Sequence, residues 1–260
     1  MNPSAPVAAC LARPGLLCVP NAWDAASARR VLAAGAPFVA TTSAAVAWSL
    51  GLPDGQAVSP AQLLQRVAEI RRACPQAALS VDIERGYHDS PAEVAAFVDA
   101  LVQAGVSGIN IEDGSDEPAR LARKISAIRA SQDRANLFIN ARIDTWLLGL
   151  GHPDTRTEDT LARARSYRNA GCDGIFVPCL ADPEAIGALV RGVDAPLNLM
   201  AVPGLPDVAM LARLGVRRLT AGPGIALASY AHCEHSARAF VQGDLAPVLG
   251  AGLAFADMEC

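Results

Sequence analysis

Four segments of this chain repeat one pattern, in which a helix-like stretch ends at a glycine and a short connector leads into an apolar run. A glycine at this place closes a helix in the left-handed conformation without steric cost. The four glycines are Gly35, Gly105, Gly171 and Gly215. Other apolar runs lie between these segments, at residues 16–20, 78–84, 137–144 and 197–201. The alternation predicts eight strands separated by helices.

Two amphipathic stretches, residues 60–73 and 91–104, each open with proline, which suits the first position of a helix. The strands read as continuous apolar runs, as expected for parallel strands covered on both faces. The pattern therefore predicts an α/β protein, a single (β/α)8 TIM barrel over residues 1–260. A doubly wound open sheet is the alternative. No G-x-G-x-x-G follows the first strand, which disfavours its nucleotide-binding form.

Composition excludes several classes of protein. The net charge is -4 and no dense basic run occurs, so nucleic acid and membrane surfaces are not expected partners. No uninterrupted apolar stretch reaches the roughly 18 residues of a membrane span, and the N-terminus lacks a signal-peptide pattern. Seven scattered cysteines form no C-x-x-C pair, which indicates reduced thiols. We therefore expect a cytoplasmic protein.

Polar residues collect at the carboxyl ends of the predicted strands, where a barrel places its active site. The stretch LSVDIERGY carries Asp82 and Glu84, and the period-2 geometry of a strand predicts both side chains on one face. The neighbouring strand ends and loops contribute Thr42, Ser43, Ala44, Asp54, Glu112, Asp113, Asn140, Arg142 and Asp144.

Acids at strand ends also serve as helix caps or ion-pair partners, and for Asp113 and Asp144 both interpretations stay open. For Asp82, Glu84 and Glu112 the structural interpretation is disfavoured, because one arginine cannot offset three buried carboxylates. A divalent cation can. Carboxylates without Cys or His in the pattern suit Mg²⁺ or Mn²⁺, held with several water molecules.

These stretches resemble the isocitrate lyase/phosphoenolpyruvate mutase superfamily along nearly the whole chain. The matching pieces are NAWDAASARRV (21–31), TTSAAVAWSLGLPDGQ (41–56), VDIERGY (81–87), INIEDG (109–114) and NARIDTW (140–146). The resemblance implies a barrel, often with a C-terminal helix exchanged between subunits. It also implies a homodimer or homotetramer.

The resemblance implies roles for individual residues. Asp82 would be the direct metal ligand, while Glu84, Asp54 and Glu112 would hold water molecules around the ion. Glu84 stands where the family usually has a second aspartate. Backbone N–H groups around Thr42, Ser43 and Ala44 would bind a substrate carboxylate, and Arg142 would bind substrate and stabilise developing charge. Asn198 lies near a family asparagine that binds substrate.

Two departures from the family bear on the proton-transfer residues. Lyases acting on isocitrate or methylisocitrate carry a cysteine- and histidine-bearing loop after the fourth strand. Here the chain reads EDGSDEPARLARKISAIRA, which has neither residue, and the lysine- and asparagine-bearing gate of the mutase branch is absent too. Tyr87 and His88 are the candidates for relaying protons in this chain.

The chemistry expected is metal-dependent cleavage of a C–C bond in a small 2-oxo or 2-hydroxy mono- or dicarboxylate, through an enolate. The alternatives are P–C bond chemistry of the phosphoenolpyruvate or carboxyphosphonoenolpyruvate mutase type, and oxaloacetate decarboxylation. A Schiff base is excluded because the only lysine, Lys124, lies in a helical segment. A catalytically silent barrel that acts as a binding protein is a further alternative. A barrel oxidoreductase is disfavoured, since no flavin or nicotinamide signature occurs.

Overall fold

The computed structural model describes residues 6–132, 136–250 and 252–259. In that part of the chain the strands form one parallel sheet, in the order β1-β9-β8-β7-β6-β5-β4-β3-β2. Their bounds are β1 Leu17–Val19, β2 Asn21–Ala22, β3 Val39–Thr41, β4 Leu79–Asp82, β5 Gly108–Glu112, β6 Phe138–Arg142, β7 Gly174–Val177, β8 Leu197–Met200 and β9 Arg218–Thr220.

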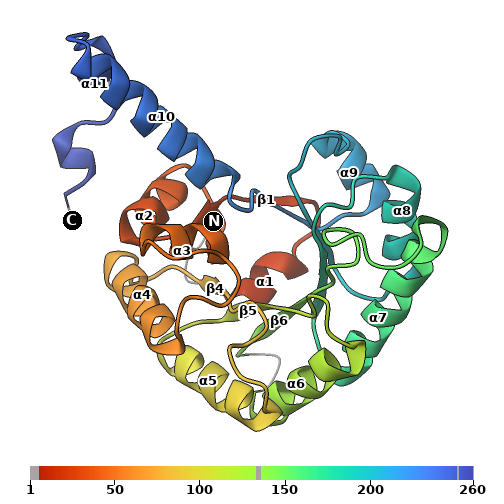
Figure 1. The fold of residues 1–260 in the computed structure, drawn as a ribbon. Helices are drawn as coiled ribbons and strands as arrows, with labels where there is room; N and C mark the ends of the chain where they lie inside the picture. The colour runs from red at the N-terminus through yellow and green to blue at the C-terminus, as the bar shows by residue number, and fades with distance from the viewer. Residues whose placement is uncertain (1–5, 133–135, 251, 260) are drawn as a thin grey trace.

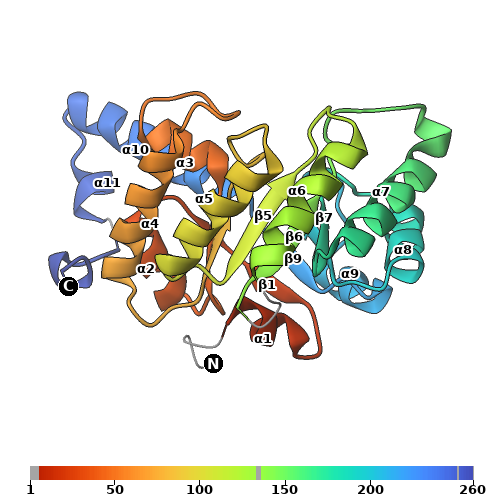
Figure 2. The ribbon, with the colours of Figure 1, turned by 90° about the horizontal axis from the view of Figure 1, so that it is seen from below.

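Helices surround this sheet, as Figures 1 and 2 show. Their bounds are α1 Val7–Ala12, α2 Ala25–Ala33, α3 Ser43–Ser49, α4 Pro60–Ala73, α5 Pro91–Gln103, α6 Pro118–Ser131, α7 Arg156–Ala170, α8 Pro183–Gly192, α9 Val208–Leu214, α10 Gly224–Val241 and α11 Ala246–Leu249. The two ends of the sheet meet, since β1 pairs with β9 and β2, directly after β1 in the chain, pairs with β3. The predicted (β/α)8 barrel is therefore confirmed and the open doubly wound sheet is excluded.

The predicted strand at residues 16–20 covers β1 alone, and the additional strand β2 follows it directly; together the two close the barrel. Leu17 in β1 lies in register with Arg218 in β9, while Asn21 in β2 lies in register with Ala40 in β3. Only Pro20 separates β1 from β2, and proline has no N–H to donate to a sheet ladder. The eight predicted strands therefore become nine, because β1 and β2, which are consecutive in the chain, pair with opposite ends of the sheet.

The predicted helix ends are confirmed. Gly35, Gly105, Gly171 and Gly215 all have φ between 90° and 112°, which is the left-handed region that a side chain rarely adopts. Gly171 and Gly215 follow α7 and α9 as left-handed C-caps. The predicted helix at 60–73 matches α4, and the predicted helix at 91–104 matches α5 to within one residue.

The amino-terminal end of the barrel is closed by α1. Val7 and Leu11 of this helix pack with Phe38, Ala78 and Phe138 in a small apolar cluster. A Cβ built on Gly108 would lie 3.2 Å from the side chain of Val7, so the helix approaches the start of β5 closely. The carboxyl ends of the strands are left as the open mouth.

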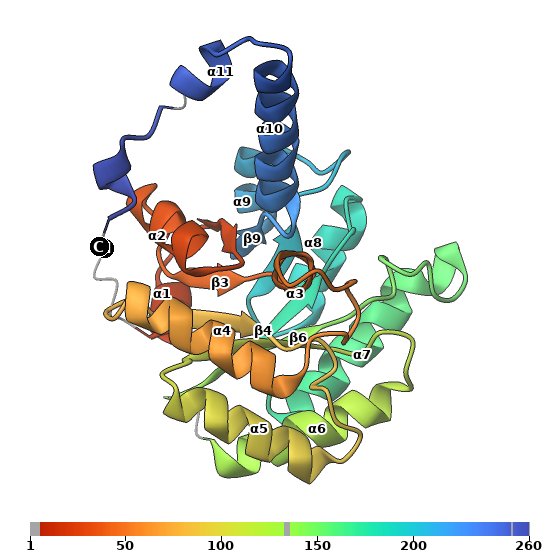
Figure 3. The same ribbon diagram turned by 60° about the vertical axis from the view of Figure 1, so that its left-hand side comes forward.

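The C-terminal part of the chain leaves the barrel. Figure 3 shows α10 projecting outward, with α11 and the following segment returning toward α2. Arg29 of α2 donates to the backbone oxygen of Met258 at 2.7 Å, which anchors this return. In the part of the chain that the structure describes, no helix combines the length and apolar character needed to cross a membrane.

Candidate active site

A cavity of about 160 Å³ opens at the carboxyl ends of the strands. Six residues singled out from the sequence line it: Thr42, Ser43, Ala44, Asp54, Asp82 and Arg142. The other lining residues are Asn21, Thr41, Asn110, Leu147, Phe176, Pro178, Met200, Thr220, Gly222 and Pro223. The strand ends therefore bring together most of the predicted metal-binding and carboxylate-binding residues.

Asp82 is the last residue of β4 and is buried. Its backbone N–H donates to Thr41 Oγ1 at 2.9 Å, and its Oδ2 accepts from the Ser43 N–H at 3.3 Å. These bonds link β4 to the end of β3 and the start of α3. They aim the Asp82 carboxylate toward the same corner of the cavity as Thr42 and Ser43.

Glu84 lies close to Asp82, but the geometric reason predicted for this is wrong. β4 ends at Asp82, and Glu84 has a φ of 49°, so strand periodicity does not orient its side chain. Its carboxylate instead accepts from the Gln56 N–H and, at 3.1 Å, from the Tyr87 hydroxyl. Burial, together with the charges of Asp82 and Asp54, raises the pKa of Glu84 to about 7.

Arg142 lies between two carboxylates. Its Nε and Nη2 donate to Asp144 at 2.6 Å and 3.1 Å, and its Nη1 lies 2.6 Å from Glu112 Oε2 in an ion pair without hydrogen-bond alignment. Burial alone would lower the pKa of Arg142, but Glu112, Asp144 and Asp82 raise it above its ordinary value. Burial also raises the pKa of Glu112, against the opposing effect of Arg142. Asp144 is therefore an ion-pair partner rather than a helix cap.

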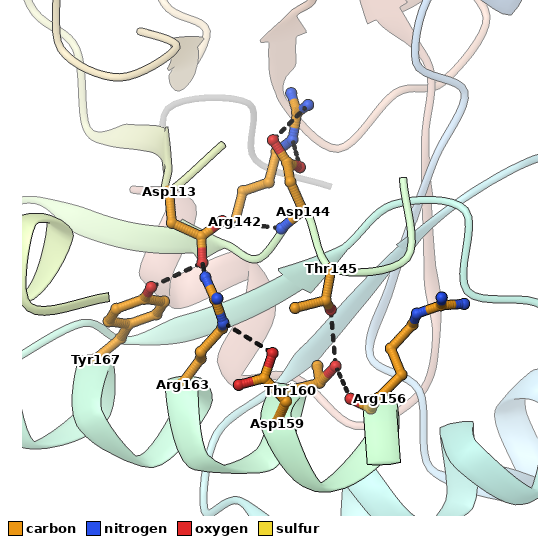
Figure 4. A network of polar contacts seen from close by, with 9 residues as sticks. All are labelled: Asp113, Arg142, Asp144, Thr145, Arg156, Asp159, Thr160, Arg163 and Tyr167. Atoms are coloured by element: carbon orange, nitrogen blue, oxygen red, sulfur yellow. Dashed lines mark hydrogen bonds and ion pairs between the residues drawn. The ribbon is translucent and has the colours of Figure 1, made fainter. Parts of the chain in front are cut away.

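A second set of contacts fixes the Arg142 strand end from behind (Figure 4). Asp113 Oδ1 accepts from the Asp144 N–H at 2.9 Å. Asp113 Oδ2 accepts from Arg163 Nη1 at 2.9 Å and from the Tyr167 hydroxyl at 2.7 Å, both on α7. Asp113 is 1% exposed and does not line the cavity. Its role is to hold the backbone that carries the Arg142–Asp144 pair.

Backbone strain gathers around the same mouth. The non-glycine residues with positive φ in the described part of the chain are Gln56, Glu84, Tyr87 and Cys179. Glu84, Tyr87 and Cys179 follow the carboxyl ends of β4 and β7, and Gln56 lies in the connection between α3 and α4, where its N–H contacts Glu84. Such conformations cost about 1–3 kcal/mol each and persist where surrounding contacts enforce them, most often at functional sites.

Glu84 and Glu112 lie beside the cavity but outside its lining, and so do the remaining predicted residues. Tyr87 reaches the site only through Glu84. His88 is half-buried, with its ring 6.4 Å from that of Phe97. Asn198 is buried one inward-facing position below Met200 on β8, and its amide has no hydrogen-bond partner among the described residues.

Sequence reasoning missed a buried cation beside Asn198. Arg218 on β9 lies in register with Asn198, and its guanidinium lies 5.4 Å from the ring centroid of Phe38. None of its side-chain nitrogens has a hydrogen-bond partner in the described residues. Burial lowers the pKa of Arg218 to about 10, against the attraction of Asp82. The only sequence signal for this buried cation was that Arg218 stands in the predicted strand segment RRLTA.

The donor set fits one hydrated divalent ion. In the described residues, no three His, Cys, Asp or Glu side chains gather closely enough to ligate an ion directly. Asp82 faces the cavity, while Glu84 and Asp54 lie near enough for their charges to act on one another. One direct carboxylate with further acids reached through water is the pattern that Mg²⁺ accepts. Burial and then the charges of Asp82 and Asp54 raise the pKa of Glu84, and a nearby cation would favour its ionised form.

A closed parallel barrel with an acid-lined cavity at the carboxyl ends of its strands is the architecture of a (β/α)8-barrel enzyme. A family model described as phosphoenolpyruvate phosphomutase matches residues 8–241. The chain belongs to the phosphoenolpyruvate mutase/isocitrate lyase superfamily, an enzyme superfamily that includes mutases and lyases.

Individual relatives support this assignment. An uncharacterized protein of Mycobacterium tuberculosis is 41% identical over 233 residues, which cover 88% of this chain and 86% of that protein. The crystal structure of a candidate phosphonomutase from Burkholderia cenocepacia is 38% identical, with a TM-score of 0.82 over 88% of this chain and 96% of that one. A phosphonopyruvate hydrolase crystallised with oxalate and Mg²⁺ shares the fold, with a TM-score of 0.83 at 23% identity over 99% of this chain and 94% of that one.

Proposed function

We propose that this protein is a Mg²⁺- or Mn²⁺-dependent carbon–carbon lyase that acts on a small 2-oxo or 2-hydroxy carboxylate. The observation that carries the proposal is the group of acids at the cavity mouth: Asp82 and Asp54 line the cavity, and the buried Glu84 beside them has its pKa raised to about 7 by burial and by its acidic neighbours. A protein that merely used these acids as caps would not need to crowd them. The phosphonopyruvate hydrolase of similar fold, crystallised with Mg²⁺ and oxalate, supports the choice of ion.

Each residue then has a stated task. Asp82 would hold the ion directly, and Glu84, Asp54 and Glu112 would accept hydrogen bonds from the water molecules around it. Such an ion would supply Lewis-acid stabilisation for the negative charge that develops as the C–C bond breaks. The Ala44 N–H would bind the substrate carboxylate together with the Ser43 N–H, which in this structure donates to Asp82 Oδ2. Arg142 would place a fixed positive charge beside the reacting oxygen.

Tyr87 is the better candidate for handling a proton. Its hydroxyl donates to Glu84, and burial with the surrounding acids raises the pKa of Tyr87, so it keeps its proton at neutral pH. It reaches the cavity through Glu84, which has a pKa near neutrality. His88 packs toward Phe97 instead.

Mutase-type P–C bond chemistry is the second candidate, because the Burkholderia relative at 38% identity is named for it. Both candidates need the same metal-binding half of the site. A Mg²⁺-dependent screen over oxaloacetate, methylisocitrate, dimethylmalate and phosphonopyruvate, read as pyruvate or other oxo-acid release, separates them. A mutase would convert phosphonopyruvate to phosphoenolpyruvate without releasing an oxo acid, so formation of phosphoenolpyruvate from phosphonopyruvate alone would favour the mutase branch.

The metal assignment is tested by titration calorimetry with Mg²⁺ and Mn²⁺. We expect Asp82→Ala to abolish binding and the thermal stabilisation that accompanies it. Glu93→Gln, which removes an exposed acid from the first turn of α5, is the control and should bind as the wild type does. Undiminished binding in Asp82→Ala, or no binding in the wild type, would refute the assignment.

A further inference from the structure

The cavity has two unlike walls. One wall, described above, carries Asp82, Ser43 and Arg142. The other is formed by Phe176 and Met200 in β7 and β8, by Leu147 and Pro178, which follow β6 and β7, and by Pro223, which precedes α10. Phe176 lies next to the polar wall, with its ring centroid 5.9 Å from the Arg142 guanidinium carbon.

The second wall, which we call the apolar wall, offers a ligand no hydrogen-bond donor from its side chains. Leu147, Phe176 and Met200 carry no N–H or O–H group. Pro178 and Pro223 lack even a backbone N–H. The nearby hydroxyl of Thr220 donates to the Leu199 carbonyl at 3.1 Å. A charged group placed against this wall would lose its water without gaining a partner.

Positively charged side chains are also scarce in the cavity lining. Among the described residues that line the cavity, Arg142 is the one lysine or arginine, and Glu112 and Asp144 already bracket it. Arg218 is fully buried and lies outside the lining. The acids of the polar wall leave one place for a substrate anion, where the metal ion would bind. A second carboxylate or a phosphonate on the same substrate has no countercharge.

We propose that the substrate is a 2-oxo monocarboxylate whose 2-oxo end meets the polar wall and whose short alkyl end packs on the apolar wall, against Phe176 and Met200. A hydroxyl at C4 between these ends lets the C3–C4 bond break as that hydroxyl loses its proton, giving an aldehyde and the enolate of a smaller 2-oxo acid. This inference rests on the proposed function and narrows its substrate class. Burying one further methylene on such a wall tightens binding by about fourfold. Placing a carboxylate there without a partner is unfavourable by far more.

Two stable probes of equal length test the inference. 2-Hydroxybutyrate and malate differ only in a methyl group against a carboxylate at the end that faces the apolar wall. In calorimetric titrations with saturating Mg²⁺, we expect 2-hydroxybutyrate to bind at least about tenfold more tightly than malate, since an unpaired buried charge costs more than about 1.4 kcal/mol. Oxalate has no group that could reach the apolar wall, so its binding tests the metal-binding part of the site alone.

A matched pair of variants tests whether the preference between the two probes arises at the apolar wall. Leu147→Arg adds the missing cation to the apolar wall at a residue that is 39% exposed and should tolerate the change. We expect it to tighten malate binding about tenfold or more and to weaken 2-hydroxybutyrate binding. Leu148→Arg makes the same change at the next residue, which is 49% exposed and outside the lining, and should leave both affinities unchanged.

The possible outcomes separate this inference from the proposed function. If oxalate binds with Mg²⁺ but malate binds as tightly as 2-hydroxybutyrate, or neither binds, the inference is wrong and the metal site stands. If oxalate does not bind, both are overturned. Equal effects of the Leu147 and Leu148 variants would likewise refute the role of the apolar wall.

Discussion

Glu84 is a buried carboxyl group whose protonation is set by its neighbours. Its hydrogen bonds from Gln56 and Tyr87 favour the ionised form, yet burial and the charge of Asp82 outweigh them. The folded protein therefore keeps this proton to a higher pH than the unfolded chain does. That difference links the pH to the stability of the metal-free protein.

For the metal-free protein we expect a loss of stability as the pH rises. The folded pKa of about 7 lies above the ordinary 4.5, so the free energy of unfolding falls between these values, by about 3 kcal/mol in total. Glu84→Gln should remove this fall. Calorimetric unfolding in EDTA at about pH 5 and about pH 8 measures it, and parallel pH profiles for wild type and variant would contradict the prediction.

Arg163 forms ion pairs with two carboxylates, Asp113 and Asp159, which differ in how far they are buried. Asp113 is buried, whereas the Asp159 side chain is 42% exposed. We expect Asp113→Asn to lower the free energy of unfolding by about 3–5 kcal/mol, because a buried guanidinium loses its counterion. Asp159→Asn should cost less than about 1 kcal/mol. Urea denaturation measures both, and similar losses would show that Asp113 does not anchor the Arg142 strand end.

Single residues also show how far the sequence can be interpreted alone. Asp82 and Arg142 were predicted to lie at the mouth because they end apolar strands, and the structure places both in the cavity lining. The position of Glu84 depends on a left-handed backbone held by Gln56, a contact between residues 28 positions apart. The apolar wall could not be predicted, because Phe176 and Met200 look like ordinary core residues until the barrel curvature is known.

Among the elements, helices such as α4 were easier to predict than strand ends. α4 is marked by Ser59 and Pro60, whose capping contacts are local in the sequence. The strand predicted at residues 16–20 covers β1, whereas β2 was missed, since the short segment after Pro20 pairs only when the sheet closes around it. Prediction therefore succeeded where the interactions are short-range.

The connection between β5 and α6 leads to a prediction about substrates. Only residues 113–117 join Glu112 to Pro118, and the segment contains neither cysteine nor histidine. Without a general acid carried by this loop, isocitrate and methylisocitrate cleavage should be slower by about 10²–10⁴-fold than in an enzyme that has one. Product release measured with Mg²⁺ tests this. Methylisocitrate turnover at about 1–10³ s⁻¹ would show that another residue, first of all Tyr87, supplies the proton.

For the whole molecule, the projecting C-terminal part exposes an apolar surface. Large apolar side chains that remain exposed in this part are Leu227, Tyr230, Phe240, Val241, Leu245, Val248, Leu249, Leu253 and Phe255. Exposed apolar side chains in such number mark an association surface. We propose that a second copy of the chain covers it in a homodimer or homotetramer, with α10 exchanged between subunits; residues 251 and 260 of this part lie outside the described residues.

Light scattering at micromolar concentration tests the assembly. We expect a mass that is a multiple of 26.9 kDa for the wild type and a smaller mass for the double variant Phe240→Asp/Val241→Asp. Val208→Asp changes an exposed apolar residue on α9 and serves as the control that keeps the wild-type mass. A wild-type mass near that of one chain would rule out association.

The pairing of β1 with β9 has a consequence for how the protein is made. Translation delivers Leu17 early and its partner Arg218 late, so the newly made chain carries an unpaired first strand through most of its synthesis. Until residues 218–220 have left the ribosome, the sheet is open and both of its edges can pair with strands of other chains. A chain released before this point cannot close its barrel. Pairing of β9 is therefore the step that protects the nascent chain from edge-to-edge aggregation.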